Sequence, residues 1–402
     1  MTPHLLVAIS SHGYGHLSQI APVINALRVM SDQTLVPGFE LTIRSSLPPS
    51  QIARRVTYDF TLDAGSDDFG MVMHDALHVD LVQSLRQYAM LHTNWPLAVN
   101  RLADHLTSLG VTGVVADAPY LTLAAAQAAG IPCVGVCSLN WADILEQCVA
   151  RQPGALRAAD VSPYTLAHIL QQIRQAYACA QVIVRPEPAL ETSQLQTLTI
   201  DPIAPATGTA NRDGLLRLIE AQFKVQHETD LHNAMLANKP CWIVLTSMGG
   251  IDLPLDPRLW PTQCLGRHVV YLMANDTVKA GPLACPHIIA MDFEGIGFEQ
   301  LMASCDLVLT KPGYGMFVEA RTCCKPILYL ARDDWPESPC LEQWASTYAD
   351  AIKLSSEQLS QGRFRTELEQ LLTLPTQPHV TFDGARQAAR LIASELLSQL
   401  RI

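Results

Sequence analysis

A short apolar strand, a glycine turn and an amphipathic helix follow one another at the start of the chain. Residues 4–9, HLLVAI, form an apolar run of the length that a buried parallel strand requires. Gly13 and Gly15 then lie in the sequence HGYGH, and apolar residues recur at helical spacing over residues 20–27. This order predicts a βα unit of an open α/β sheet, which binds ligands at the carboxyl ends of its strands.

Two histidines flank this turn and would lie at the mouth of the sheet. For His12 we favour a structural role, as a helix cap or a partner of a backbone carbonyl, although His12, Gly13 and Gly15 together could form an acceptor or phosphate loop. His16 comes where the helix begins, and we predict that it is catalytic. No metal is expected, because neither an HExxH motif nor a cysteine pair lies nearby.

The same alternation of apolar strands and helical stretches continues along the chain. The strands are expected at residues 5–9, 41–43, 114–116, 133–137, 182–184, 242–246, 269–272, 288–291, 307–309 and 326–330. Alternating strands and helices predict an α/β protein with parallel sheets.

Residues 199–211 interrupt this pattern with prolines, a glycine and scattered polar residues, as interdomain linkers do. We therefore predict an N-terminal Rossmann-like domain over residues 1–200 and a linker over 201–213. A second Rossmann-like domain is expected over 214–382, and a helix over 383–402 should pack back across the domain junction. Two such domains would face a central cleft.

Composition excludes several classes of partner. The chain has 402 residues, 49% of them hydrophobic, so two domains with sizeable cores are expected. A formal net charge of −11 repels the phosphate backbone, and nucleic acid is not an expected partner. No apolar run is long enough for a membrane span, and the N-terminus does not resemble a signal peptide, so a cytoplasmic location is expected. The sequence does not predict an oligomeric state.

Two glycine-containing loops in the second half suit a nucleoside diphosphate. The first follows the strand at 242–246, and its expected donor-binding residues are Ser247, Gly249 and Gly250. The second follows the strand at 307–309, and its expected donor-binding residues are Lys311, Gly313, Tyr314, Gly315 and Glu319. Lys311 and a helix N-terminus can balance phosphate charge, while Glu319 can accept hydrogen bonds from ribose hydroxyls. As alternatives, the glycines could make ordinary turns and Glu319 could be a solvated helix carboxylate.

The second loop, KPGYGMFVEA, resembles the donor motif of GT-B glycosyltransferases, which are built from two Rossmann-like domains. The resemblance spans nearly the whole chain. It implies that Lys311 takes the basic position, Gly313 the glycine and Glu319 the ribose-binding glutamate. Met316 departs from the motif, because a serine or threonine that binds phosphate usually stands there. Backbone amides must then suffice, or donor binding is weaker or different.

The N-terminal half carries the matching acceptor motifs. GYGHLSQIAPVINAL resembles the segment that supplies the catalytic base, which falls on His16, and VVADAPYLTLAAAQAAGIP resembles the segment of its partner aspartate, which falls on Asp117. Asp117 follows the strand at 114–116, so it should reach the same sheet edge as His16. A carboxylate bonded to one imidazole nitrogen fixes the tautomer and stabilises the imidazolium. Alternatively, Asp117 could cap the next helix.

The closest resemblance is to the glycosyltransferase-like N-terminal domain of L-arabinokinases. It rests on HGYGH, LDAGSDDFGMVMHDALHVDLVQSL, SLNWADILEQ, KPGYG and LARDDWPESPCLEQW. The last segment replaces an Asp-Gln pair that contacts the sugar in many GT-B enzymes, so Asp333, Asp334 and Glu337 are candidate sugar contacts, or else surface carboxylates. The chain contains no kinase phosphate loop, and kinase activity is not expected of it.

The predicted function is transfer of a sugar from a nucleoside diphosphate sugar, with UDP as one possible carrier, to a small-molecule acceptor. The resemblance implies inversion, with His16 and Asp117 as the general base dyad and no cofactor besides the co-substrate. A noncatalytic nucleotide-sugar sensor and a GT-B epimerase or hydrolase remain alternatives. Polar residues expected near the acceptor, unless several of them are simply loop and surface groups, are Asp63, Asp67, Asp68, His74, Asp75, His78 and His92.

Overall fold

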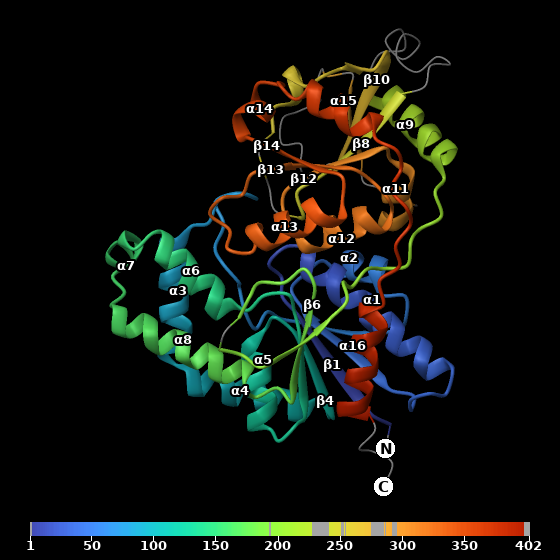
Figure 1. Cartoon of the computed structure of the whole chain (residues 1–402). Coiled ribbons are helices and arrows are strands. Elements are labelled where there is room, and N and C mark those ends of the chain that lie inside the picture. The colour runs from blue at the N-terminus through green and yellow to red at the C-terminus, as the bar shows by residue number, and fades with distance from the viewer. Residues whose placement is uncertain are drawn as a thin grey trace.

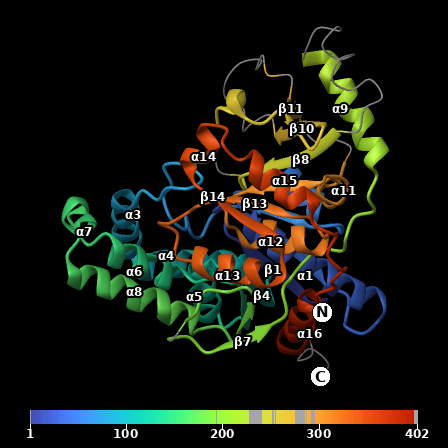
Figure 2. The same ribbon diagram turned by 45° about the horizontal axis from the view of Figure 1, so that its top comes forward.

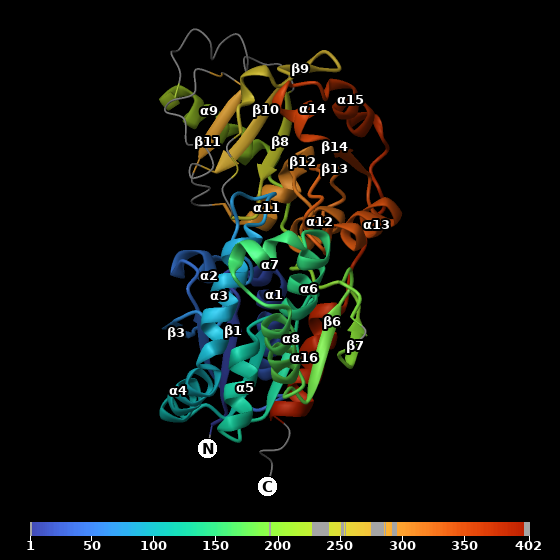
Figure 3. The same ribbon diagram turned by 90° about the vertical axis from the view of Figure 1, so that its left-hand side faces the viewer.

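The computed structural model consists of two α/β domains (Figure 1). It describes residues 2–192, 194–226, 241–250, 253, 255–274, 285, 287–291 and 296–397. The N-terminal domain is the lower one in Figure 1, and Figure 3 shows α12 (Tyr314–Thr322) and α13 (Ser338–Tyr348) of the upper domain facing it.

The first sheet is parallel throughout, with the strand order β3-β2-β1-β4-β5-β6-β7. Its strands are β1 (His4–Ile9), β2 (Glu40–Ser45), β3 (Thr61–Ala64), β4 (Gly113–Asp117), β5 (Cys133–Val136), β6 (Val182–Pro186) and β7 (Thr197–Ile200). The strand order reverses between β1 and β4, as in a doubly wound sheet.

The second sheet has the order β11-β10-β8-β12-β13-β14, with β9 added antiparallel to β10. Its strands are β8 (Cys241–Ser247), β9 (Gln263–Cys264), β10 (Arg267–Ala274), β11 (Ile288–Met291), β12 (Leu307–Thr310), β13 (Ile327–Leu330) and β14 (Ala351–Leu354). Apart from β9, this sheet repeats the winding of the first, and its order reverses between β8 and β12. The α/β fold with two parallel-dominated sheets confirms the predicted fold class.

The helices cover both sheets. Those before β8 are α1 (Gly15–Asp32), α2 (Pro49–Arg55), α3 (Leu81–Thr93), α4 (Trp95–Ser108), α5 (Tyr120–Ala128), α6 (Trp141–Arg151), α7 (Gly154–Ala159), α8 (Pro163–Tyr177) and α9 (Arg212–Gln226). Those after it are a short 3₁₀ turn (Pro257–Leu259), α11 (Phe298–Ser304), α12 (Tyr314–Thr322), α13 (Ser338–Tyr348), α14 (Ser356–Ser360), α15 (Arg365–Thr373), α16 (Gly384–Ile392) and a π-helical turn (Ala393–Leu397).

Strand β1 shows why the sheet is buried on both faces. Leu6 and Ala8 belong to the apolar cluster on one face, whereas Leu5, Val7 and Ile9 belong to the cluster on the other. Side chains alternate along a strand, so a strand covered on both sides is apolar at every position.

Helix α16 returns from the second domain to the first. Ala388 and Ile392 of α16, and Leu396 beyond it, lie in the same buried cluster as Ile20 and Ile24 of α1. Figures 1 and 2 show α16 beside α1. The helix predicted over residues 383–402 therefore packs on the N-terminal domain as far as residue 397, and its last five residues lie outside the described part of the chain.

Candidate active site

His16 and Asp117 meet where the order of the first sheet reverses. His16 is the second residue of α1, and Asp117 ends the neighbouring strand β4. Nδ1 of His16 donates a hydrogen bond to Oδ1 of Asp117, at 3.0 Å. Asp117 is fully buried and does not cap α5, whose N-cap residue is Pro119. The predicted pair is therefore in contact, in the geometry that a general base requires.

The surroundings of His16 favour its charged form. Burial by itself lowers the pKa of His16, but the Asp117 carboxylate outweighs burial and raises that pKa above its ordinary value, with help from Asp68 and Glu337. Because Nδ1 is bound to Asp117, Nε2 is the nitrogen that can take a proton. His16 can thus remove a proton from a hydroxyl group and hold the positive charge against Asp117.

A second buried carboxylate, Asp68, lies near this pair. Its Oδ1 accepts a hydrogen bond from Ser10 Oγ at 3.1 Å, and its Oδ2 accepts one from Trp141 Nε1. The ring of Trp141 also lies against His16, with centroids 5.8 Å apart. Burial raises the pKa of Asp68 to about 6, against the opposing effect of His16. The charges of Asp68 and His16 therefore influence each other's protonation.

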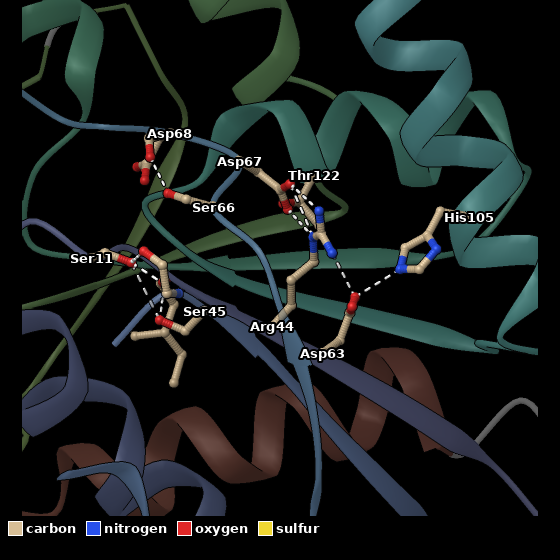
Figure 4. Close-up of polar contacts among 11 residues, drawn as sticks. Ser11, Arg44, Ser45, Asp63, Ser66, Asp67, Asp68, His105 and Thr122 are labelled. Carbon is tan, nitrogen blue, oxygen red and sulfur yellow. Dashed lines mark hydrogen bonds and ion pairs between the residues drawn. The ribbon is translucent and has the colours of Figure 1, made fainter. Parts of the chain in front are cut away.

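The aspartates beside Asp68 have a structural role. Nε of Arg44 donates to both oxygens of Asp67 at 2.9 and 2.8 Å, and its Nη1 donates to Asp63 at 2.6 Å. Thr122 Oγ1 donates to Asp67 at 2.7 Å. Figure 4 shows this cluster, with Asp68 further along the same loop. Arg44 balances the charge of Asp63 and Asp67, so these residues hold the loop that presents Asp68.

The remaining polar residues expected near the acceptor lie elsewhere. His78 is largely exposed and pairs with Asp75 at 2.9 Å, and His74 is exposed on the same loop. His92 is buried, and its Nε2 lies 3.0 Å from the hydroxyl of Tyr120. Burial lowers the pKa of His92 to about 4. The structure gives these side chains partners away from the His16–Asp117 pair.

His12 contacts one tryptophan from each domain. Its ring stacks on Trp335, with centroids 5.2 Å apart and planes within 9°, and meets Trp141 edge-on at 5.2 Å. Burial and then the charge of Arg332 lower the pKa of His12 well below its ordinary value. Helix α1 has no side-chain cap. His12 therefore does not cap α1, and its ring packs between two tryptophans that the sequence separates widely.

The two glycine turns meet across the domain junction. Gly13 has φ +80° and Gly250 has φ +81°, a conformation that favours glycine. Tyr14 N donates to Gly249 O at 3.0 Å, and a Cβ at Gly250 would overlap with the Tyr14 ring. Gly15 is different, since a Cβ there would meet nothing within 4 Å. The first turn therefore packs directly on the expected donor loop.

Lys311 lies at the point where the second sheet reverses. Thr310 Oγ1 donates to Ser247 O at 2.7 Å and joins the ends of β12 and β8. A Cβ at Gly249 would lie 3.7 Å from Nζ of Lys311, so the ammonium group is beside the glycine turn. Burial and then the charge of Arg332 lower the pKa of Lys311 well below its ordinary value. A buried ammonium beside such a turn is suited to an anionic ligand.

Helix α12 begins at Tyr314, and its N-cap residue, Gly313, offers no side-chain cap. Its first N–H groups are therefore available to an anion, as at other helix N-termini. Met316 packs against the apolar core of the second domain, so this position supplies no hydroxyl to a phosphate. The hydroxyl of Tyr314 accepts a hydrogen bond from Ile203 N at 2.7 Å, which fixes the start of the helix.

Glu319, the predicted ribose contact, is bound by an arginine of the other domain. Nη1 of Arg55 donates to Oε1 of Glu319 at 2.9 Å and to Oε1 of Glu299 at 3.1 Å. Oε2 of Glu319 is buried without a partner. A Cβ at Gly315, one turn earlier, would overlap with Ser18 Oγ of α1. Helix α12 thus contacts the first domain closely, and one oxygen of Glu319 remains available.

Replacing Arg55 by methionine is expected to lower the free energy of unfolding by about 1–3 kcal/mol, because Glu319 and Glu299 then lose their shared cation. Chemical denaturation measures the effect, and Glu319→Gln in the same chain should recover part of it. Arg258→Met is the matched control, since its pair with Asp256 is exposed and such pairs contribute little. If Arg55→Met and Arg258→Met lower the free energy of unfolding equally, Arg55 does not stabilise Glu319 and Glu299 as assigned.

The three carboxylates expected near the sugar have other partners. The Asp333 side chain is 85% exposed. Oδ2 of Asp334 accepts a hydrogen bond from Val79 N at 2.8 Å, and Oε1 of Glu337 accepts one from Ser138 Oγ at 3.0 Å. Asp334 and Glu337 thus join the loop after β13 to the first domain, and their contact with a sugar stays a prediction.

The structure adds two residues at this loop that the sequence analysis did not select, Arg332 and Trp335. The guanidinium of Arg332 lies 4.0 Å above the ring of Trp335, and both side chains are buried. The motif LARDDWPE contains both residues, but a single sequence does not show whether an arginine is buried or exposed.

Within the described ranges, no three histidine, cysteine, aspartate or glutamate side chains are grouped as metal ligands would be. No described helix combines the length and the apolar character needed to cross a bilayer.

No family model matches the chain. The L-arabinokinase of Arabidopsis thaliana is 22% identical over 401 residues, which cover 97% of this chain and 34% of that protein. The chain therefore spans about a third of the length of the curated relative it matches.

Several solved structures share the fold over almost the whole chain. The glycosyltransferase VinC in complex with dTDP has a TM-score of 0.54 and 17% identity, and 98% of this chain and 95% of VinC are covered. The calicheamicin glycosyltransferase CalG4 has a TM-score of 0.56 and 12% identity, with 98% and 94% covered. A UDP-glucosyltransferase from Polygonum tinctorium has a TM-score of 0.52 and 12% identity, with 98% and 99% covered. The chain therefore has the GT-B fold of these glycosyltransferases, as its sequence predicted.

Proposed function

We propose that the protein transfers a sugar from a nucleoside diphosphate sugar to a hydroxyl group of a small acceptor. The observation that carries the proposal is the hydrogen bond between His16 and Asp117 at the switch point of one sheet, while Lys311 and the uncapped α12 lie at the switch point of the other. Structures with the same fold include a complex with dTDP and a UDP-glucosyltransferase, which supports a nucleotide-sugar donor.

In the proposed reaction, Nε2 of His16 takes the proton of the acceptor hydroxyl. At the same time the oxygen of that hydroxyl bonds to the anomeric carbon of the sugar. The bond from that carbon to the diphosphate breaks, and the diphosphate leaves with the electron pair. Asp117 stabilises the imidazolium, while Lys311 and the first N–H groups of α12 offset the charge of the leaving group. Attack from the side opposite the diphosphate inverts the configuration.

Thermal stability measured with UDP, GDP, dTDP, CDP and ADP tests the donor site. A ligand at about 100 times its dissociation constant stabilises the protein by about 2.7 kcal/mol. Release of the diphosphate is then followed with and without acceptor alcohols. Release that needs an acceptor supports a transferase. Release without one identifies a hydrolase, conversion of the sugar without release an epimerase, and binding without reaction a sensor; no stabilisation by any diphosphate contradicts the proposal.

Turnover is expected to rise with pH through a midpoint above 6.5, the ordinary pKa of histidine. A general base must be unprotonated, and Asp117 raises the pKa of His16, so His16 is inactive on the acid side of the midpoint. Asp117→Asn removes the charge and should move the midpoint of kcat/KM to lower pH. A pH profile that Asp117→Asn leaves in place would assign the titration to another group.

A further inference from the structure

Arg332 is a buried cation, and two of its three side-chain nitrogens make no hydrogen bond within the described residues. Its side chain is 3% exposed, and its Nε and Nη2 are buried without a hydrogen-bond partner. Within the described residues it forms no ion pair, and its guanidinium rests on the ring of Trp335. Burying such donors unpaired is unfavourable, more so when the group is charged. A missing ligand would explain why the fold keeps an arginine here.

The neighbouring carboxylates do not accept hydrogen bonds from Nε and Nη2 of Arg332. Oε1 and Oε2 of Glu337 accept hydrogen bonds from Ser138 and from Trp335 Nε1. Oδ2 of Asp334 is bound to a backbone amide, and its Oδ1 makes no hydrogen bond to Arg332. The charge of Arg332 also lowers the pKa of Lys311, so the two cations repel each other across the site. The site therefore holds two buried cations near each other, with the charge of Glu337 acting on both.

The position of Arg332 separates it from the expected diphosphate site. Lys311 directly follows β12, beside the Gly249 turn, whereas Arg332 follows β13, the next strand outward in the sheet. Adjacent strands lie about 4.8 Å apart. If Lys311 and the start of α12 hold the diphosphate, the sugar attached to it is the next group of the donor and would lie toward Arg332. Arg332 contacts Trp335, which stacks on His12 of the first domain, so it also lies toward the acceptor side.

We propose that Arg332 binds a carboxylate group of the substrate, so that the sugar transferred is a uronic acid carried by the nucleoside diphosphate. Nε and Nη2 lie side by side on one edge of a guanidinium, which matches the two oxygens of a carboxylate. The proposal rests on the proposed donor site. A carboxylate on the acceptor would meet the same chemical requirement, and the experiment separates the two sources.

The test compares the glucuronate and glucose forms of the nucleoside diphosphate that stabilises the protein, in the wild type and in Arg332→Gln. Two charged hydrogen bonds should favour the acidic donor about 100-fold in the wild type and should be lost in the variant. Arg151→Gln is the matched control, because Arg151 bonds to Asp333 O in the same loop from an exposed position. It should keep the preference.

The other outcomes are distinct. If Arg332→Gln weakens both donors equally, the arginine binds the diphosphate and the proposal fails. If the donors bind equally but free glucuronate binds better than methyl glucoside in an Arg332-dependent way, the carboxylate belongs to the acceptor. If no diphosphate binds, the proposed function fails. Free glucuronate alone then tests Arg332, and equal stabilisation of wild type and variant overturns the inference.

Discussion

Replacing His16 by asparagine is expected to lower kcat about 10²- to 10⁴-fold, the usual contribution of general base catalysis. The asparagine amide can still donate to Asp117, so the buried carboxylate keeps its partner and the fold should be preserved. It cannot take a proton from the acceptor. The affinity for the nucleoside diphosphate should stay unchanged, because His16 belongs to the first domain and the expected donor loops to the second. Steady-state kinetics and calorimetry measure the two effects separately.

His78→Asn is the control for this substitution, since His78 is exposed and its ion pair is with Asp75 rather than with Asp117. It should leave kcat unchanged. If His16→Asn keeps more than about a tenth of the wild-type kcat, another group acts as the base. Asp68 is then the first candidate, because it is buried near His16 and has a pKa of about 6.

Replacing Lys311 by methionine is expected to lower kcat/KM about 10²- to 10³-fold, as the loss of one group that stabilises transition-state charge does. Diphosphate affinity should fall as well. The ligand-free protein should become more stable, because Lys311 is buried, carries no described ion pair and is repelled by Arg332. A gain of about 1 kcal/mol would raise the melting temperature by about 2–4 °C for a domain of this size.

A residue that binds ligand is recognised when its replacement lowers diphosphate affinity but raises the melting temperature. Replacement of a structural residue lowers the melting temperature. Lys353→Met is the control, since Lys353 is partly exposed and pairs with Glu342 at 2.9 Å. Its removal should change neither the melting temperature nor the affinity markedly. A Lys311→Met variant that is destabilised and still binds the diphosphate normally would place the ammonium in the fold rather than in the donor site.

The fold was largely predictable because parallel strands covered on both faces are apolar at every position. The ten predicted strands fall on elements of the two sheets. The edge strands β3, β7 and β14 were not predicted, since they are short and partly exposed and so lack a continuous apolar run. Topology then brought His16 and Asp117 together, because both follow neighbouring strands of the same sheet.

The sequence by itself determined the two α/β halves and the glycine turns, and it placed His16 and Asp117 at the same edge of one sheet, because these depend on local periodicity and on which strand ends precede a motif. Only the tertiary structure decided that Arg55 binds Glu319, that Asp68 lies near His16, and that Nε and Nη2 of Arg332 are buried without a hydrogen-bond partner. The residues in each contact are far apart in the chain or lie in different domains. Burial and charge pairing are set by such contacts, and a single sequence records neither.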